Sequence, residues 1–521
     1  MTGNTYLLWL LLIPLVFSIL AFVARWFGRL TRAVVILAHL ISVTAVLVLS
    51  LLTIQFVLVS GQVFGLGSWL HVDALGAIFL LIIAVVGFLV GLYSIGYTDH
   101  ELKTGEFDND KLCNYYGLFS LFILTMLLVV ISNNIIMMWV AVEATTLGSA
   151  FLVGIYGHRE SLEAAWIYVV ICTAGVAFGL YGTVLVYSNA FNVMQASGGN
   201  AALWTEIVKN VQGLDPAMLK IAFVFVLVGF GTKAGLFPMH TWLPDAHSEA
   251  PSPVSAMLSG VLLSCALLVI FRFAIITNLV VGSSFTQTLF LIFGTLSVVA
   301  SAFFMVAQRD IKRLLAYSSI ENIGLILIAF GLGGPAGILA GLLQTINHSL
   351  VKSLLFCTFG NIQMKYRSRS VDQIKGIFQV LPGTGFLMII GALALVGTPP
   401  FNVFVSKFLI ITAGLAAGYL WLMVVCLLLL TVVFVAFFRL MASTLFGEKP
   451  ENVTRGENNW LTLLPGAVLV LLIVGLGLFI PSQLMALLKG ASSVVLTGNP
   501  GPQIAITSLK DFLTPLARLL P

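Results

Sequence analysis

The sequence predicts an all-α protein that crosses a membrane many times, and three observations support this fold class. Of the 521 residues, 60% are hydrophobic and only 9% are charged, whereas soluble domains carry about a quarter charged residues. The mean hydropathy is +1.08. Apolar runs long enough to cross a bilayer as helices recur along the whole chain. The net charge of +5 is spread along the sequence, so we expect a lipid bilayer and no nucleic acid as partner.

We expect about fourteen membrane-spanning helices, one for each long apolar run, with the twelfth interrupted by prolines. The first run lacks the basic region and the cleavage site of a signal peptide, so we interpret it as a retained helix. The connections are short and leave no room for a soluble domain. The predicted spans are residues 5–24, 33–59, 74–97, 115–131, 134–156, 162–188, 217–238, 252–277, 284–307, 316–333, 336–361, 379–415, 416–440 and 460–481.

Basic residues predict the orientation, because loops rich in lysine and arginine stay in the cytoplasm. The richer side carries Arg25, Arg29, Arg32, Lys103, Lys111, Arg159, Arg309, Lys312, Arg313, Lys365, Arg367, Arg369, Lys375, Arg439, Lys449 and Arg455. The other side carries Lys209, Lys220, Arg272, Lys489, Lys510 and Arg518. An even number of spans then places both termini outside, on the periplasmic side of the inner (cytoplasmic) membrane.

Several ionisable residues fall inside the apolar runs, where a charge is expensive and needs a partner or a hydrated interior. They are Glu143, Lys233, His348, Lys352 and Lys407. A single buried pair could equally be a structural lock between helices. For the whole set a proton relay is the better interpretation, because burial lets lysine release its proton near neutral pH. If only structural cations were needed, arginine would serve equally well.

Two of these lysines lie beside sequences that break a helix. The stretch "VGFGTKAGLFPMHTWLPDAH" (228–247) contains Gly231, Gly235 and Pro238, and "ALVGTPPFNVFVSKFLII" (394–411) contains Pro399 and Pro400. Broken helices at membrane depth occur where they line a cavity or are buried in protein. Matching "GT" dipeptides at 231–232 and 397–398, five spans apart, predict two inverted repeats with an ion site in each.

Three motifs carry a resemblance to a known family. "FGTKAGLFPMHTWLPDAHSEAPSPVSAMLSG" (230–260), "QRDIKRLLAYSSIENIG" (308–324) and "GTPPFNVFVSKF" (397–408) resemble the antiporter-like subunits of the respiratory complex I superfamily, which are relatives of the large subunits of Mrp Na⁺/H⁺ antiporters. The resemblance covers roughly residues 70–440. Within it, "HTWLPDAHSEAPSPVSAMLSG" most resembles hydrogenase-4 component F of group 4 membrane-bound [NiFe] hydrogenases, the formate hydrogenlyase type.

The resemblance implies roles for the buried ionisable residues. Glu143 matches the family's glutamate on the fifth span, and Lys233 matches the lysine on the broken seventh span with which that glutamate pairs. His348 and Lys352 match polar positions on the eleventh span. Lys407 matches the charged residue on the broken twelfth span, at the exit half-channel.

One position departs from the family. Many relatives carry a lysine or histidine on the eighth span, where this chain has Ser264. The relay would then need water, Ser264, Ser259, His240 or His247 as a bridge. We interpret His240 and His247 either as proton-uptake groups or as polar residues at a helix end. Glu321 is a candidate uptake carboxylate or a helix-terminal charge. The basic residues at 159, 309, 312 and 313 are interpreted as topology determinants.

The same resemblance organises the chain into four parts. Residues 1–110 hold spans one to three, 111–278 the first antiporter-like repeat, and 279–441 the second. Residues 442–521 hold the last span and an amphipathic tail, with "ITSLKDFLTPLARLLP" (506–521) as a short surface helix.

Three functions fit these expectations. The first is a proton-translocating subunit of a redox-driven complex, the second a subunit of an Mrp-type Na⁺/H⁺ antiporter, and the third a non-pumping scaffold. Carboxylates are scarce inside the spans, which favours protons over sodium. The chain has no redox motif and no CxxC pair, so we expect no cofactor in it. The [NiFe] centre and iron–sulfur clusters, or flavin and quinone, would lie in partner membrane subunits and a peripheral redox arm.

Overall fold

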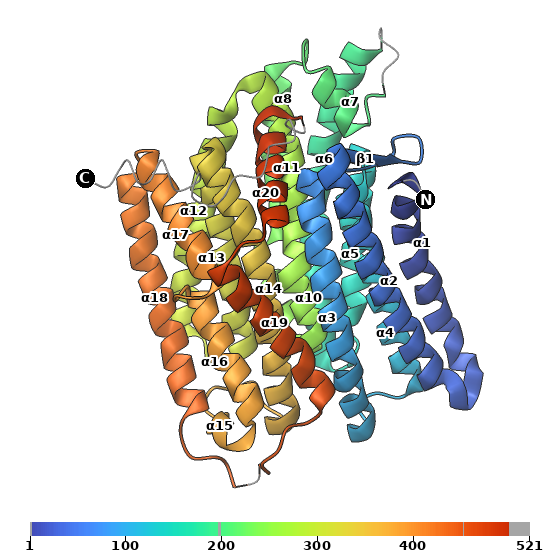
Figure 1. Cartoon of the computed structure of the whole chain (residues 1–521), viewed down its shortest axis with the longest axis vertical. Coiled ribbons are helices and arrows are strands. Elements are labelled where there is room, and N and C mark those ends of the chain that lie inside the picture. The colour runs from blue at the N-terminus through green and yellow to red at the C-terminus, as the bar shows by residue number, and fades with distance from the viewer. Residues whose placement is uncertain (1–2, 196–199, 452, 500–521) are drawn as a thin grey trace.

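The computed structural model of the chain describes residues 3–195, 200–451 and 453–499, which form one bundle of helices (Figure 1). A short antiparallel hairpin, in which Gln62 of β1 pairs with Asp73 of β2, lies with α7 at one end of the bundle, and α15 lies at the opposite end. These are called the α7 end and the α15 end below. The helices and strands in chain order are α1 (Gly3–Val23), η1 (Ala24–Leu30), α2 (Thr31–Ser60), β1 (Gln62–Gly65), β2 (Leu70–Asp73), α3 (Ala74–Thr104), α4 (Asn109–Ile131), α5 (Ile135–Val153), α6 (Arg159–Met194), α7 (Trp204–Lys209), α8 (Pro216–Ala234), α9 (Trp242–Glu249), α10 (Ser252–Met257), η2 (Leu258–Leu262), α11 (Leu263–Val281), α12 (Ser283–Ala307), α13 (Ile311–Leu332), α14 (Gly334–Tyr366), α15 (Ile377–Val380), α16 (Pro382–Val396), α17 (Asn402–Ala416), α18 (Leu420–Leu445), α19 (Trp460–Leu478) and α20 (Ser482–Thr497).

Length and apolar composition make the chain a multi-pass membrane protein, as the sequence predicts. Within the described ranges, 11 helical segments are long and apolar enough to span a membrane, and one of them, Thr5–Ser60, contains both α1 and α2. The helices α16 and α17 are shorter apolar helices, and α14 is a 33-residue helix that carries many polar residues. Each predicted apolar run overlaps at least one of these helices, and the run 379–415 overlaps both α16 and α17. The total of about fourteen spans stays a prediction.

The first broken helix, α8 followed by α9, ends its first half in a glycine turn. Gly235 follows the last residue of α8 with φ +76°, a left-handed conformation that glycine adopts without strain. The Leu236 N–H donates to the Gly231 carbonyl (2.9 Å) and the Gly235 N–H to the Thr232 carbonyl (3.2 Å). This pair of bonds is the Schellman motif that closes many helices. Pro238 lies in the connection to α9.

The second broken helix, α16 followed by α17, closes in the same way. Gly397 follows the last residue of α16 with φ +88°. The Thr398 N–H donates to the Leu393 carbonyl and the Gly397 N–H to the Ala394 carbonyl, both at 3.1 Å. Pro399 and Pro400 then separate α16 from α17, because proline has no N–H to continue the ladder.

The structure corrects the match that the sequence predicts between the two breaks. Gly231 lies inside α8 and does not break it, since the helix continues to Ala234. A glycine in a helix interior is tolerated, and only the left-handed Gly235 ends the helix. Gly235 is therefore the counterpart of Gly397, and the offset taken from the two "GT" dipeptides is wrong.

The helix after the first break contains a π-helical segment. The segments α10, η2 and α11 form one continuous helix, and its apolar window is 100% buried. Such segments often occur at functional sites. Gly260 lies within η2, and a methyl group there would come within 2.7 Å of the Ser353 Oγ and 3.0 Å of the Ser349 carbonyl of α14. The glycine thus allows the two helices to pack closely.

The C-terminal part of the described chain crosses the bundle in two helices. In Figure 1, α19 runs obliquely and α20 continues toward the α7 end. Both helices pack against α3 and α14. The sequence predicts a span over 460–481, and α20 is a further helix whose inner face, including Leu488 and Ala491, is buried. The predicted surface helix over 506–521 lies outside the described residues.

Gly477 of α19 rests directly on the second break. A methyl group at this position would lie 2.0 Å from the Pro400 carbonyl oxygen and 2.8 Å from the Asn402 nitrogen. Because these are backbone atoms, we expect Gly477→Ala to force α19 away and to destabilise the protein by about 1–3 kcal/mol. The melting temperature of the purified chain in detergent measures this. Gly475→Ala is the matched control, because nothing lies within 4 Å of that site; equal effects of the two variants would contradict the contact.

Candidate functional site

Lys233 is the buried cation of the first break. It lies in the last turn of α8, where the helix C-terminus favours a positive charge, and its side chain is 0% exposed. Its Nζ donates to the Thr146 Oγ1 of α5 (2.8 Å) and to the Tyr168 Oη of α6 (2.6 Å). Nζ also lies 4.6 Å from the centroid of the Tyr168 ring. The ammonium is therefore held by neutral oxygens and an aromatic face.

The direct ion pair expected between Glu143 and Lys233 is wrong for this structure. The Glu143 Oε1 accepts a hydrogen bond from the Thr173 Oγ1 of α6 (2.8 Å), and its Oε2 is buried without a hydrogen-bond partner. No ion pair joins the two residues within the described part of the chain. Thr146, one turn further along α5, takes the place beside the ammonium. Any influence of Glu143 on Lys233 acts through space.

Lys407 forms an ion pair that the sequence did not reveal. Its Nζ lies 3.1 Å from the Oε1 of Glu321, and the two side chains are 7% and 0% exposed. The same Nζ donates to the Leu395 carbonyl (3.1 Å) in the last turn of α16, so Lys407 links the two halves of the broken helix. Glu321 lies well inside α13, which begins at Ile311. It is the counter-ion of Lys407 and not a helix-terminal charge.

A chain of buried amides and hydroxyls extends from this pair. The Asn322 Nδ2 donates to Glu321 (2.5 Å), and the Gln344 Nε2 donates to the Asn322 Oδ1 (2.6 Å). The Ser406 Oγ donates to the Gln344 Oε1 (2.5 Å) and accepts from the Asn347 Nδ2 (2.9 Å). The network joins α13, α14 and α17 at the second break. Its sequence signal is a set of amide side chains inside apolar runs, and attention to charged residues alone does not reveal them.

His348 and Lys352 lie one turn apart on α14, in the interior of the bundle. The Lys352 Nζ donates to the Leu315 carbonyl (2.7 Å) and to the Ser318 Oγ, both on α13. Both ring nitrogens of His348 are buried without a hydrogen-bond partner.

The Ser264 position, where the resemblance implies a cation on the eighth span, holds no charge. The Ser264 Oγ is buried without a partner, and the Ser259 Oγ shares a hydrogen bond with the Ser319 Oγ of α13 (2.7 Å). His247 of α9 reaches α14 instead, where its ring stacks on Phe356 with centroids 5.2 Å apart. Both of its nitrogens are buried and unpartnered. His247 is therefore a buried ionisable residue that contacts α14 from the helix after the first break.

His240 is not positioned with these groups. It lies in the connection between α8 and α9, where its ring packs against Phe237, Phe304 and Tyr317 with centroids 5.4, 5.8 and 6.2 Å away. Its environment is aromatic, which fits the interpretation as a residue at a helix end better than that of a bridge.

The backbone groups freed by the first break have partners. The Phe237 N–H donates to the Ser297 Oγ of α12 (3.0 Å). The Trp242 indole N–H donates to the Thr232 carbonyl (2.8 Å), and the Trp242 ring packs on Tyr168 with centroids 4.6 Å apart. Broken helices inside a membrane protein need such partners, because unsatisfied backbone groups are costly there.

A second buried ion pair lies at the α7 end, away from the breaks. The guanidinium of Arg272 on α11 binds both carboxylate oxygens of Asp73 at 2.5 and 2.7 Å. Asp73 also caps α3 by accepting from the Gly76 N–H (2.8 Å), and the Trp204 ring lies 4.3 Å from the guanidinium. Burial raises the pKa of Asp73, but Arg272 outweighs burial and lowers it to about 2. Arg272, which is one of the six basic residues counted on the less basic side, is thus a structural clamp.

Two broken helices and a buried lysine series on a multi-pass bundle define a class of ion-translocating membrane proteins. The family described as NADH:quinone oxidoreductase/Mrp antiporter matches residues 132–434, and the complex I chain 5 N-terminal family matches residues 59–107. This chain belongs to the NADH:quinone oxidoreductase/Mrp antiporter family.

Individual relatives refine the comparison. The chain is 37% identical to a hydrogenase-4 component F homolog of Methylacidiphilum infernorum over 80% of this chain and 87% of the relative. It is 32% identical to a Na⁺/H⁺ antiporter subunit of Alkalihalophilus pseudofirmus over 68% of this chain, which spans only 44% of that longer protein. A chain of the archaeal membrane-bound sulfane sulfur reductase has the same fold, with a TM-score of 0.82, 26% identity and coverage of 94% of this chain and 98% of that one.

Proposed function

We propose that this chain moves protons across a membrane as the antiporter-like subunit of a redox-driven complex, of the membrane-bound hydrogenase or complex I type. The observation that carries the proposal is the series of buried ionisable side chains at and between the two breaks. Lysine is suited to this role, because desolvation favours its neutral form and so lets it release a proton near neutral pH. The similarity to hydrogenase-4 component F over most of both chains supports the redox-driven class.

The proposed route begins at Lys233 and ends at the Lys407–Glu321 pair. His247 bridges from the first half to His348 and Lys352 on α14, and the amide network around Asn322 surrounds the final pair. Glu143 acts on Lys233 through space. Exposed apolar side chains lie one helical turn from Glu143 on α5, among them Val140 (41%) and Leu147 (53%). A neighbouring membrane protein on this surface would change the field at Glu143 and hence the proton affinity of Lys233.

We propose the finer architecture on the same basis. Two inverted five-helix repeats, 111–278 and 279–441, would follow spans one to three (1–110) and precede the last span and tail (442–521), giving about fourteen spans in all. The shared Schellman motif supports this. The directions of the two broken helices also support it. The helix α8 begins near α7 at one end of the bundle, whereas α16 begins beside α15 at the opposite end (Figure 1). The predicted basic side lies at the α15 end, which would face the cytoplasm of an inner membrane with both termini periplasmic.

The electron chemistry would lie in other subunits. We propose that [NiFe] and iron–sulfur centres, or flavin and quinone, sit in a peripheral redox arm, and that further membrane subunits link that arm to this chain. Among the described residues no group of three or more His, Cys, Asp and Glu side chains could hold a metal ion.

Copurification with proton uptake is the test of the function. Native membranes solubilised in mild detergent should yield this chain together with redox subunits identified by mass spectrometry. Inverted vesicles should then acidify when the electron donor of those subunits is added.

The sequence identity to the Na⁺/H⁺ antiporter subunit supports a second candidate function, a Na⁺/H⁺ exchanger. Copurification of small hydrophobic subunits alone, with vesicle pH responding to sodium and not to an electron donor, would favour the exchanger and overturn the redox assignment. Intact complexes that move no protons would instead support the third function, a non-pumping scaffold.

A further inference from the structure

An open groove lies between α8 and α12 at the α7 end of the bundle, away from the residues of the proposed route. Its volume is about 380 Å³, and the described residues that line it are Lys220, Val281, Ser284, Phe285, Thr288 and Leu289. One ammonium and two hydroxyl groups therefore share the groove with three apolar side chains. No carboxylate is among these lining residues. We call it the seam groove, because it lies where α8 meets α12.

Contacts at both ends of the seam show that α8 and α12 run side by side. At the α7 end, the Lys220 Nζ lies 5.9 Å from the centroid of the Phe285 ring, and the Phe223 ring lies 6.4 Å from the same ring. Further along, at the first break, the Phe237 N–H donates to the Ser297 Oγ (3.0 Å). Because α11 packs against both α8 and α12, the inner side of the seam is closed and its open side faces the membrane.

Apolar side chains continue the groove from its polar rim toward the first break. Val224 of α8 is 42% exposed, and Ile292 and Leu296 of α12 are 48% and 42% exposed. From the first turn of α12 to the level of the break the seam is about 20 Å long. Half of a bilayer's hydrocarbon core is about 15 Å thick. An acyl chain that starts beside the Lys220 ammonium therefore reaches the broken helix.

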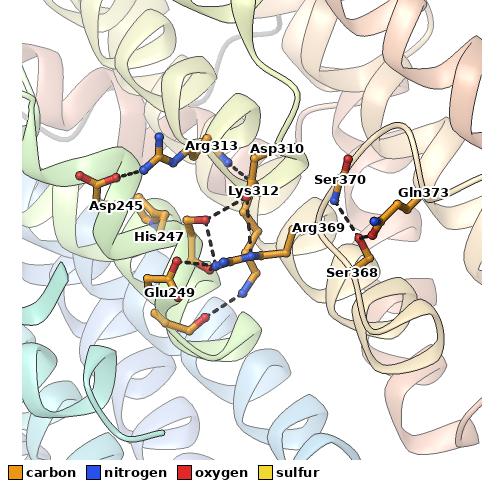
Figure 2. Close-up of polar contacts among 12 residues, drawn as sticks. Asp245, His247, Glu249, Asp310, Lys312, Arg313, Ser368, Arg369, Ser370 and Gln373 are labelled. Carbon is orange, nitrogen blue, oxygen red and sulfur yellow. Dashed lines mark hydrogen bonds and ion pairs between the residues drawn. The ribbon is translucent and has the colours of Figure 1, made fainter. Parts of the chain in front are cut away.

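Basic side chains at the opposite, α15 end have partners within the protein. Figure 2 shows Arg369 beside Glu249, with 2.7 Å between the guanidinium and the Oε1. The Lys312 Nζ donates to the Ala250 carbonyl (2.7 Å). The interpretation of Lys312 as a topology determinant is wrong, because its side chain is 1% exposed and is held by this backbone group.

Lys220 has no such partner. It is exposed, and within the described ranges it forms no ion pair. A lysine ammonium binds phosphate as a point charge, and the Ser284 hydroxyl beside it can donate a hydrogen bond. The Thr288 hydroxyl already donates to the Ser284 carbonyl (2.8 Å). Since no carboxylate lines the groove, a headgroup that carries its own cation would find no partner there.

We infer that the seam groove binds one anionic phospholipid from the leaflet at the α7 end. The lipid phosphate pairs with the Lys220 ammonium, and one acyl chain lies between α8 and α12 and reaches the first break. The charge of the rim and the apolar walls below it match the two parts of such a lipid. The inference uses only the membrane location of the chain and does not depend on the proposed function.

Native mass spectrometry of the full chain in mild detergent tests the inference, after bulk lipid is removed and dioleoylphosphatidylglycerol is added. The unmodified protein should retain one such lipid, in preference to dioleoylphosphatidylethanolamine. Lys220→Gln should weaken retention about tenfold, as expected for loss of a charged hydrogen-bond partner, whereas Lys220→Arg should retain the lipid because a guanidinium also binds phosphate. Lys209→Gln is the matched control, because that exposed lysine at the same end pairs with Glu206 (2.9 Å) and does not line the groove.

A phosphatidylglycerol with a photoreactive diazirine in one acyl chain locates the bound lipid. It should label peptides of α8 and α12, and Lys220→Gln should remove this labelling while Lys209→Gln leaves it unchanged. Equal retention of both lipids by all four proteins would overturn the inference, and so would labelling confined to other helices. If Lys220→Gln keeps the lipid but releases a subunit from the purified complex, the groove is a protein contact and the inference falls. None of these results bears on proton transport.

Discussion

Replacing Lys233 by methionine is expected to abolish proton transport and to leave the protein assembled. Methionine has a similar length and no titratable group. The hydrogen-bond partners of Lys233 are neutral, so the substitution breaks no direct ion pair. The Tyr168 hydroxyl keeps its hydrogen bond with the Ser149 Oγ (2.7 Å). Stability should therefore change little while the relay loses its first lysine.

Proton uptake by inverted vesicles and the amount of complex on native gels measure the two effects separately. Lys233→Arg is the control that keeps the charge, and it should also be inactive because arginine does not deprotonate in proteins. Rapid transport in the methionine variant would show that protons do not pass through Lys233. Loss of the assembled complex would instead show that the ammonium supports the fold.

Replacing Arg272 by methionine is expected to destabilise the protein by about 3–5 kcal/mol, because it leaves the Asp73 carboxylate buried without its counter-ion. Asp73 is 1% exposed, so water cannot take over the role of the guanidinium. Adding Asp73→Asn to Arg272→Met should restore most of the loss, since the remaining amide carries no charge. The melting temperatures of the four proteins in detergent form a double-mutant cycle. Additive effects of the two substitutions would contradict the clamp.

The same pair gives a pH dependence with a definite sign. The pKa of Asp73 is lowered from 3.8 to about 2 in the folded protein. A lowered carboxylate pKa means that the pair contributes its full stability above the ordinary value of 3.8 and loses it as the pH falls toward 2. The difference in melting temperature between the unmodified protein and the double variant should shrink over that interval.

The sequence predicted well those features that depend on local chemistry. Long apolar runs identify helices because a span must bury its backbone polar groups within itself. Glycine and proline identify the two breaks because each interferes with helix geometry in a known way. The choice between Gly231 and Gly235 could not be made, because both are glycines near the break and only the backbone shows which one is left-handed.

Partners far apart in the chain were beyond the sequence. Glu321 and Lys407 are 86 positions apart, and nothing local to either residue indicates the other. Thr146, one helical turn from Glu143, is the α5 residue that reaches the Lys233 ammonium, and this depends on how α5 and α8 pack around α6. Lys312 and Arg272 look like ordinary basic residues near span ends, and their burial follows from how the neighbouring helices meet.

The two breaks share one hydrogen-bond pattern, yet Lys233 precedes its break in the chain whereas Lys407 follows its break. Lys233 belongs to the helix that ends at the glycine, whereas Lys407 belongs to the helix that begins after the prolines and reaches back to the Leu395 carbonyl. Loss of charge at Lys233 changes the electrostatics of a single helix end. Loss of charge at Lys407 weakens the tie between two half-helices as well as the ion pair with Glu321. Only the second break therefore couples its protonation to the mechanical freedom of the backbone around it.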